Sequence, residues 1–189
     1  MKQIFAILFL TLSGLLSARA QVDLFLRFIP TNAAPTVKGD STDPTYRGVD
    51  GWMNIRSFSL GVNNPTTIGS ATGGAGVGRA TFLEVNFAKD VNSGSPALFQ
   101  ALTSGAHFDT AQVMVRRAGA RNGEAYLSYE FRLVYPTAQT WAGGGDVPEE
   151  DLRFVHGGFR ITYRPQNADG TLGPPVVAQW SQVTNTPTF

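Results

Sequence analysis

The strongest constraint on the fold is an alternation of apolar and polar residues with a period of two. The clearest example is the segment 125–135, where the large apolar residues are Leu127, Tyr129, Phe131 and Leu133. The residues between them, Ser128, Glu130 and Arg132, are polar. Because successive side chains of a strand point to opposite faces, the segment predicts a β-strand with one face in a core and a polar opposite face.

The same period recurs along the chain between short turn segments. It predicts further strands at residues 22–29, 52–60, 79–87, 113–116, 152–164 and 176–181. In the segment 152–164 we place Val155 and Phe159 on the apolar face, and at 52–60 the imperfect alternation suggests a bulge. Turn residues lie at 119–123 and 167–170. Many short strands joined by Gly- and Asp-rich turns are typical of an antiparallel barrel or sandwich.

One segment has helical spacing instead. Ser95 is the expected N-cap, Pro96 the first helical residue, and Gly105 is placed to end the helix. The apolar residues between them are Leu98, Phe99 and Leu102. The sequence therefore predicts one short helix packed against the side of the strands.

Residues 1–20 have the three-part order of a signal peptide. Lys2 precedes an uncharged apolar run, which is followed by small residues at Ala18 and Ala20. We expect cleavage between Ala20 and Gln21, which leaves residues 21–189 as one mature domain outside the cytoplasm. The apolar run is shorter than the roughly 20 residues that span a bilayer, and we expect no membrane span in the mature chain.

Charge and composition exclude several classes of function. The formal net charge is +1, and the basic residues are scattered, so the surface needed to bind a nucleic-acid backbone is missing. The chain has no cysteine, which excludes disulfides, thiolate nucleophiles and thiolate metal ligands. Hydrophobic residues make up 42% and charged residues 15%, a balance that predicts a single globular domain.

The sequence also lacks a catalytic or metal-binding constellation. His107 and His156 have no third ligand at metal spacing, and we interpret both as structural or surface residues. The carboxylates of residues 149–151 resemble a solvated loop, with a calcium site as the less favoured interpretation. No serine stands in a Gly-x-Ser-x-Gly motif. We therefore expect a protein that is not an enzyme and holds no cofactor.

The segment 61–78 is too polar and too rich in glycine to form a core element. Its glycines do not fit a phosphate-binding loop, because the Gly-Lys-Ser/Thr ending is missing. Loops of this length in a compact domain are usually functional or disordered. We expect this loop to contact something outside its own fold.

Several motifs in a fixed order resemble the haemolysin-coregulated protein (Hcp) family. They are Phe87-Ala88-Lys89-Asp90, Ser95-Pro96-Ala97-Leu98, Ser104-Gly105-Ala106-His107, the strand from Val113 to Gly119, and the run from Ile161 to Gly170. The resemblance covers roughly residues 22–183. It implies a mainly β fold, a compact antiparallel β-barrel of two sheets with one short flanking α-helix.

The resemblance also implies a function. Hcp proteins form the tube of type VI secretion, in which hexameric rings stack, carry effectors in their lumen and engage a spike protein at the tip. The chain would then be a ring-forming structural subunit, a conduit and carrier. In this family the long loop packs against neighbouring copies, which gives these candidate interface residues: Asn63, Asn64, Thr66, Ile68, Gly73, Gly74, Gly76 and Val77.

The signal peptide is a departure from the family, whose tube subunits assemble in the cytoplasm. It leaves open an alternative in which the Hcp-like fold serves as an extracellular or periplasmic binding module. Trp52, Trp141 and Trp180 would then form a glycan-stacking platform. The expected location is secreted or periplasmic, or extracellular when the type VI machine delivers the protein.

Overall fold

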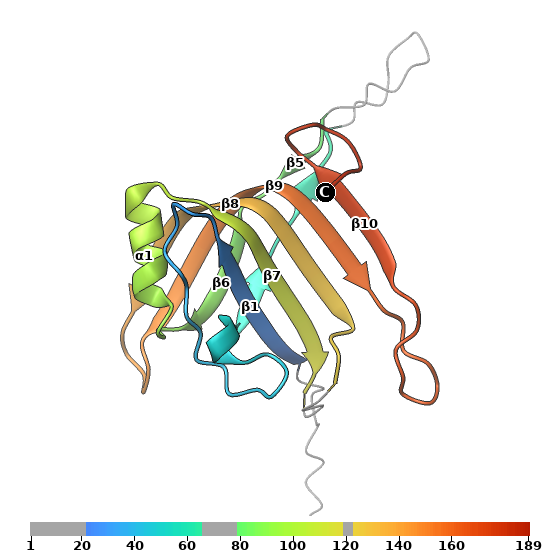
Figure 1. Ribbon diagram of the computed structural model, residues 1–189, viewed down its shortest axis with the longest axis horizontal. Helices are drawn as coiled ribbons and strands as arrows, with labels where there is room; N and C mark the ends of the chain where they lie inside the picture. The colour runs from blue at the N-terminus through green and yellow to red at the C-terminus, as the bar shows by residue number, and fades with distance from the viewer. Residues whose placement is uncertain (1–21, 66–78, 119–122) are drawn as a thin grey trace, which may run out of the picture.

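The structure is a computed structural model that describes residues 22–65, 79–118 and 123–189 (Figure 1). In chain order the elements are β1 (Val22–Pro30), the 3-10 helix η1 (Gly48–Asp50), β2 (Met53–Asn54), β3 (Ser57–Ser59), β4 (Val62–Asn63), β5 (Thr81–Phe82), β6 (Val85–Asp90), α1 (Ser95–Ser104), β7 (Phe108–Arg117), β8 (Leu127–Ala142), β9 (Glu149–Tyr163) and β10 (Val176–Ser181). Strands dominate, and α1 is the single α-helix of the described residues. This confirms the mainly β fold with one flanking helix.

The strands form a strongly curled antiparallel sheet. Among the described residues it has eight strands in the order β2-β1-β7-β8-β9-β6-β3, with β10 paired to β9 outside this path. The long strand β9 pairs with β8 along one edge, while its other edge is shared by β6 and β10. Figure 1 shows α1 at one end of the curl and β10 at the other. A separate two-stranded ribbon joins β4 and β5.

Consecutive residues connect the two ends of the sheet. The backbone N–H of Ile55 donates to Leu24 O on β1 at 3.1 Å, and that of Arg56 donates to Ala88 O on β6 at 2.7 Å. The predicted strand at 52–60 is therefore two short strands, β2 and β3, on opposite ends of the sheet. The imperfect alternation of the sequence marks the point where the chain crosses between them.

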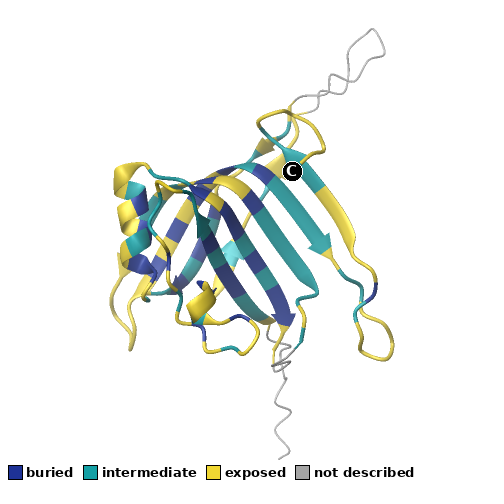
Figure 2. Ribbon diagram, viewed as in Figure 1, coloured by how far each residue is buried: buried dark blue, intermediate teal, exposed yellow. Residues whose placement is uncertain are grey.

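The apolar side chains inside the curl form the main core. Phe87, Phe131 and Phe154 are fully buried there, and Leu98 and Ala101 of α1 complete one side. Figure 2 shows that the buried positions concentrate on β1, β7, β8 and β9, whereas β10 is more exposed. Burial of several phenylalanines at native packing density is a large stabilising contribution in a domain of this size.

The ends of α1 agree with the prediction at one terminus only. Gly105 ends the helix in the left-handed conformation, with φ of 70°, which glycine adopts without strain. At the other terminus the predicted N-cap is wrong, because Gly94 holds that position and Ser95 is already helical. The Ser95 hydroxyl is used elsewhere, since it accepts a hydrogen bond from the backbone N–H of Asn92 at 3.0 Å.

A second, smaller cluster lies on the outer face of β1. Phe25 stacks on Tyr46 with ring centroids 4.6 Å apart, and Tyr46 meets Trp52 edge-on at 5.0 Å. The segment between β1 and β2 therefore covers this part of the sheet instead of projecting from it. A strict two-residue period in β1 puts Leu24, Leu26 and Phe28 on one face, so the sequence pattern does not identify Phe25, on the opposite face, as buried.

At Leu133 the alternation of inward and outward side chains along β8 shifts by one residue. Its φ is 53°, a left-handed value that is unusual for a side chain other than glycine, and it turns Leu133 outward to 40% exposure. Val134 is buried in its place. On β9 the same change makes Val155 exposed (42%) and His156 buried (8%). The predicted inward positions of Leu133 and Val155 are therefore wrong.

The described residues contain no helix that is long and apolar enough to cross a membrane. The predicted signal peptide and its cleavage site, Ala20 and Gln21, lie outside the described residues.

Candidate functional site

The predicted interface loop is only partly described. Asn63 lies on β4 and Asn64 directly follows it, and both side chains are exposed. The other candidates, Thr66, Ile68, Gly73, Gly74, Gly76 and Val77, lie outside the described residues. The structure does describe the residues on either side of this segment, which form the ribbon of β4 and β5.

This ribbon is anchored on the main sheet by aromatic packing. The ring of Phe82 lies 5.3 Å from His156 and 5.9 Å from Phe159, measured between centroids. Next to this contact Val62 (55% exposed) and Leu83 face solvent. The ribbon and the residue after it thus expose two apolar side chains to solvent. Exposed apolar side chains of this kind are typical of a surface that a partner protein covers.

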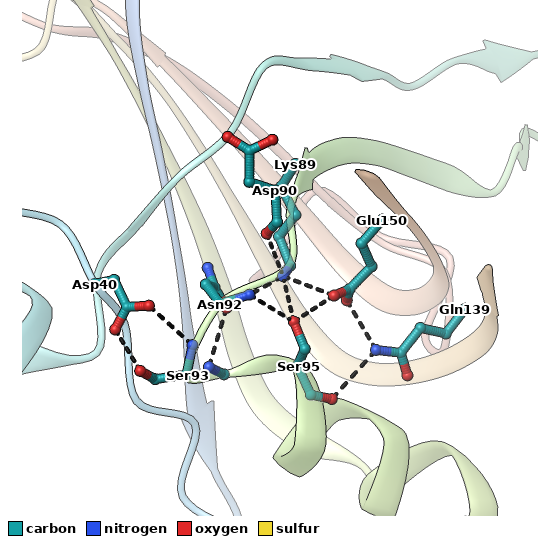
Figure 3. A network of polar contacts seen from close by, with 9 residues as sticks. Asp40, Lys89, Asp90, Asn92, Ser93, Ser95, Gln139 and Glu150 are labelled. Atoms are coloured by element: carbon teal, nitrogen blue, oxygen red, sulfur yellow. Dashed lines mark hydrogen bonds and ion pairs between the residues drawn. The ribbon is translucent and has the colours of Figure 1, made fainter. Parts of the chain in front are cut away.

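A buried ionic cluster fixes α1 to the sheet (Figure 3). The ammonium group of Lys89 on β6 lies 3.0 Å from Glu150 Oε2 on β9 and 2.9 Å from Ser95 Oγ. The Ser95 hydroxyl donates to the same carboxylate, and Gln139 Nε2 on β8 donates to its other oxygen at 2.8 Å. Three strands and the first turn of the helix therefore meet at one carboxylate.

The electrostatics of this cluster balance burial against pairing. Burial lowers the pKa of Lys89, and the neighbouring carboxylate of Glu150 opposes that shift. Further acceptors surround the ammonium group, namely the backbone oxygen of Asp90 and Asn92 Oδ1, both at 3.2 Å. The cluster acts as a structural joint, because its hydrogen bonds link three strands to α1, although Gln139 Oε1 is buried there without a hydrogen-bond partner among the described residues.

The acidic run at residues 149–151 does not converge on a metal. It begins β9, so Glu150 points inward to Lys89 while Glu149 points outward and pairs with Arg56. No group of three metal-binding side chains is found in the described parts of the chain. The interpretation of these carboxylates as a solvated face is wrong for Glu150, which is almost fully buried.

A second buried ion pair holds the segment between β1 and β2. Arg116 on β7 lies 2.9 Å from Asp23 and also binds Asp43, and its guanidinium stacks 5.0 Å from the ring of Phe25. Hydrogen bonding from Arg116 lowers the pKa of Asp43 to about 2. The segment is therefore tied to the outer face of the sheet by charge as well as by its aromatic side chains.

The outer face also carries a ladder of polar side chains across five strands. Its members lie in register from β1 to β10: Arg27, Gln112, Glu130, Arg160 and Gln179. Each is bonded to the next, for example Gln112 Nε2 to Glu130 at 3.1 Å and Arg160 Nε to Gln179 at 3.1 Å. The ladder consists of two arginines, one glutamate and two amides, so this part of the outer face is polar and carries a net positive charge.

The two histidines have separate structural surroundings. His107 stacks on Tyr135 with centroids 4.8 Å apart. His156 is enclosed by Phe82, Phe131 and Phe159, and burial lowers its pKa to about 4. The structure does not bring the two together.

The tryptophans do not form a stacking platform. Trp52 is buried under Tyr46 and the guanidinium of Arg27, whose carbon lies 4.6 Å from the indole ring. Trp180 lies on β10 opposite Phe159, and Trp141 packs beside α1. A planar sugar ring needs an exposed aromatic face, and Trp52 offers none.

The fold and these clusters define the class of the protein, a mainly β structural protein whose buried charges connect strands and loops in the described residues. Residues 25–163 match the family described as type VI secretion system effector, Hcp. The chain belongs to this Hcp family, which confirms the resemblance found in the sequence.

Individual relatives agree with this assignment. The protein hcp1 of Pseudomonas aeruginosa is 31% identical over 101 residues, which cover 52% of this chain and 62% of that relative. The matched part is thus less than two thirds of the relative. A solved structure of a type six secretion system protein has a TM-score of 0.76 with 26% identity, covering 88% of this chain and 99% of the other. Hcp1 of Salmonella typhimurium has the same fold, with a TM-score of 0.69, 19% identity and coverage of 90% and 100%.

Proposed function

We propose that this chain is a structural subunit of a type VI secretion tube. Copies would close into a hexameric ring, rings would stack, and the tube would carry effectors and meet a spike protein at its tip. The observation that carries the proposal is the family match over residues 25–163, together with a fold that superimposes on nearly the whole of a solved type six secretion system protein.

Two surfaces of the subunit support ring closure. A head-to-tail ring requires two different patches that complement each other. One is the β4–β5 ribbon with exposed Val62, Asn63 and Asn64. The other is the outer edge of β10, where Val176 and Val177 are exposed and no strand is paired within the described residues. An exposed apolar edge strand is a template for pairing with another chain.

The proposal includes no chemical step. The charged clusters at Glu150 and Arg116 agree with a structural role, because each of them connects segments of this chain. Two routes out of the cytoplasm are alternatives. Delivery of a cytoplasmically assembled tube by the type VI machine would make the protein extracellular, whereas export through residues 1–20 would fit the second candidate, a secreted or periplasmic binding module with the Hcp fold.

Ring formation is tested with purified residues 21–189. Light scattering coupled to size exclusion is expected to give six times the monomer mass, and electron microscopy to show rings. A Val62→Asp variant should reduce the ring fraction, because it places a charge in the proposed contact. The matched control is Val49→Asp, whose side chain is exposed on η1, away from the ribbon and from β10. A strict monomer at the highest attainable concentration would refute the proposal.

A further inference from the structure

The outer face of β8 and β9 binds an aromatic ring in this structure. The ring of Phe189 lies 3.9 Å from the guanidinium carbon of Arg160 and 5.0 Å from that of Arg132. It covers Gly158, where an added Cβ would approach two ring carbons to 3.7 and 3.8 Å. These three residues form the ring site, a name used below for Arg132, Gly158 and Arg160.

Gly158 lies beneath the ring. It pairs with Arg132 on β8 and with Ser181 on β10, so it lies in the middle of three strands. Glycine inside a strand lowers stability and often marks a close approach by another group. Here that group is the side chain of Phe189, with which an added Cβ at Gly158 would be in ordinary van der Waals contact.

Arg160 is held in position before any ring binds. Its Nε donates to Gln179 at 3.1 Å, and its terminal nitrogen lies 3.6 Å from Glu130. Both contacts use the edge of the planar guanidinium and leave one of its faces for the ring. A guanidinium that is already oriented loses little further freedom when an aromatic side chain stacks on it.

The segment that delivers Phe189 is held to the sheet of its own chain by a small number of hydrogen bonds. Gln182 donates from its side chain to His156 O at 2.6 Å and from its backbone to Gly157 O at 2.7 Å. Residues 183–188 beyond it are exposed and turn back at Asn185, with φ of 57°. Two more hydrogen bonds connect this segment to β10. Ser181 N donates to Thr186 O at 2.9 Å, and Gln179 Nε2 donates to Pro187 O at 3.3 Å. The ring is thus carried on an exposed arm that begins at the outermost strand.

We propose that the ring site is an exchangeable binding site for an aromatic side chain, and that in the assembled protein its occupant is Phe189 of a second copy of this chain. The inference rests on the proposed function, in which copies of the chain close into a ring of subunits. Exchange keeps every contact identical, so a neighbouring copy held nearby competes with the arm of the same chain at little cost. β10 has no named strand on its outer side among the described residues, so the arm can reach an adjoining copy once the Ser181–Thr186 bridge and the hydrogen bond from Gln179 to Pro187 O are broken.

Disulfide trapping tests the exchange directly, because the natural chain has no cysteine. A Thr186→Cys chain is mixed with a Ser181→Cys chain, because these residues are bridged when the ring site is occupied and neither of them belongs to it. The expected mixed disulfide can form only between two copies. The control pair combines Thr186→Cys with Val49→Cys. Mixed dimer about tenfold above the control is expected when copies are held together. Mixed dimer at the control level would overturn the exchange.

Peptide binding tests the ring site whether or not the subunits assemble into an oligomer. The acceptor is the full Phe189→Ala chain, and the probe is a labelled peptide with the sequence of residues 182–189. The intact chain should bind it about tenfold more weakly because its own arm competes. Adding Arg160→Ala to the acceptor should abolish binding, and the exposed control Arg153→Ala should not.

The outcomes separate the two proposals. Equal binding to the intact chain and to the Phe189→Ala chain, or binding of a peptide that lacks the phenylalanine, would remove the ring site even when light scattering shows rings. Peptide binding by a strictly monomeric protein would instead support the ring site and refute the tube subunit, and with it the second copy as occupant.

Discussion

Lys89 Nζ lies 3.0 Å from Glu150 Oε2, and neither side chain is exposed to solvent. The pair joins β6 to β9 immediately beside the start of α1. A buried pair of this kind gives little net stability compared with apolar packing, but loss of one partner leaves an uncompensated charge. The cluster therefore fixes where the helix docks and is sensitive to single substitutions.

Lys89→Met is expected to lower the free energy of unfolding by about 3–5 kcal/mol, because Glu150 then stays buried without its cation. Urea denaturation followed by fluorescence measures the change. Arg56→Gln is the control, since Arg56 pairs with Asp90 and Glu149 at the exposed surface, where such pairs contribute at most about 1 kcal/mol. Equal effects of the two variants would contradict the buried-pair interpretation.

Stability should fall between pH 6.5 and pH 4 because of His156. Its pKa is about 4 in the folded protein against 6.5 for the free side chain, so in this range the unfolded chain binds the proton more tightly. The contribution is complete above pH 6.5, and about 3 kcal/mol is lost as the pH falls to 4. Denaturant titrations at a series of pH values measure it.

The variant His156→Phe should flatten this slope, because it removes the titrating group from its aromatic surroundings. His107→Phe should keep the slope, because it leaves His156 in place. Asp43, with a pKa of about 2, acts in a lower window, between pH 3.8 and 2. An unchanged slope in His156→Phe would assign the pH dependence to another group.

Leu133→Gly should raise the free energy of unfolding by about 0.5–1 kcal/mol, since glycine adopts the left-handed backbone without strain. Lost packing offsets part of the strain relief, because the side chain is 40% exposed and otherwise packs against Gly157. Thr140→Gly, at an exposed position of β8 without a positive φ, should lower the free energy of unfolding by about 0.5–1 kcal/mol. Thermal unfolding of both variants distinguishes the effects, and a destabilised Leu133→Gly would argue against backbone strain.

Export should remove residues 1–20. Intact mass and N-terminal sequencing of protein recovered from outside the cytoplasm are expected to begin at Gln21. Replacing the small residue Ala20 by Leu should block processing, because signal peptidase requires small residues at this site. Ala33→Leu, at an exposed position of the mature chain, is the control that leaves processing intact. Recovery of mature protein that still begins at Met1 would show that the segment is retained.

Much of the fold could be predicted because it depends on local patterns. The last strand, Val176–Ser181, was located at its observed bounds, and Gly105 was identified as the end of the helix. Gly170 occupies the expected turn with φ of 88°. Period, turn residues and helix terminators act within a few residues of one another, so the sequence alone specifies them.

The candidate sites were less predictable, because their residues meet only across strands. Nothing local indicates that Lys89 pairs with Glu150, or that Gly158 lies beneath Phe189. A signal was available in each case, a lysine inside an apolar strand and a glycine where a strand should carry a side chain.

What the sequence determined by itself is the set of elements and the family that their motifs identify. The tertiary structure alone decided the crossing of the chain at Ile55 and Arg56, the shift in alternation at Leu133 and the burial of Glu150. The physical reason is that hydrogen bonding between distant strands and the pairing of buried charges depend on neighbours in space, which the periodicity of a single segment does not encode.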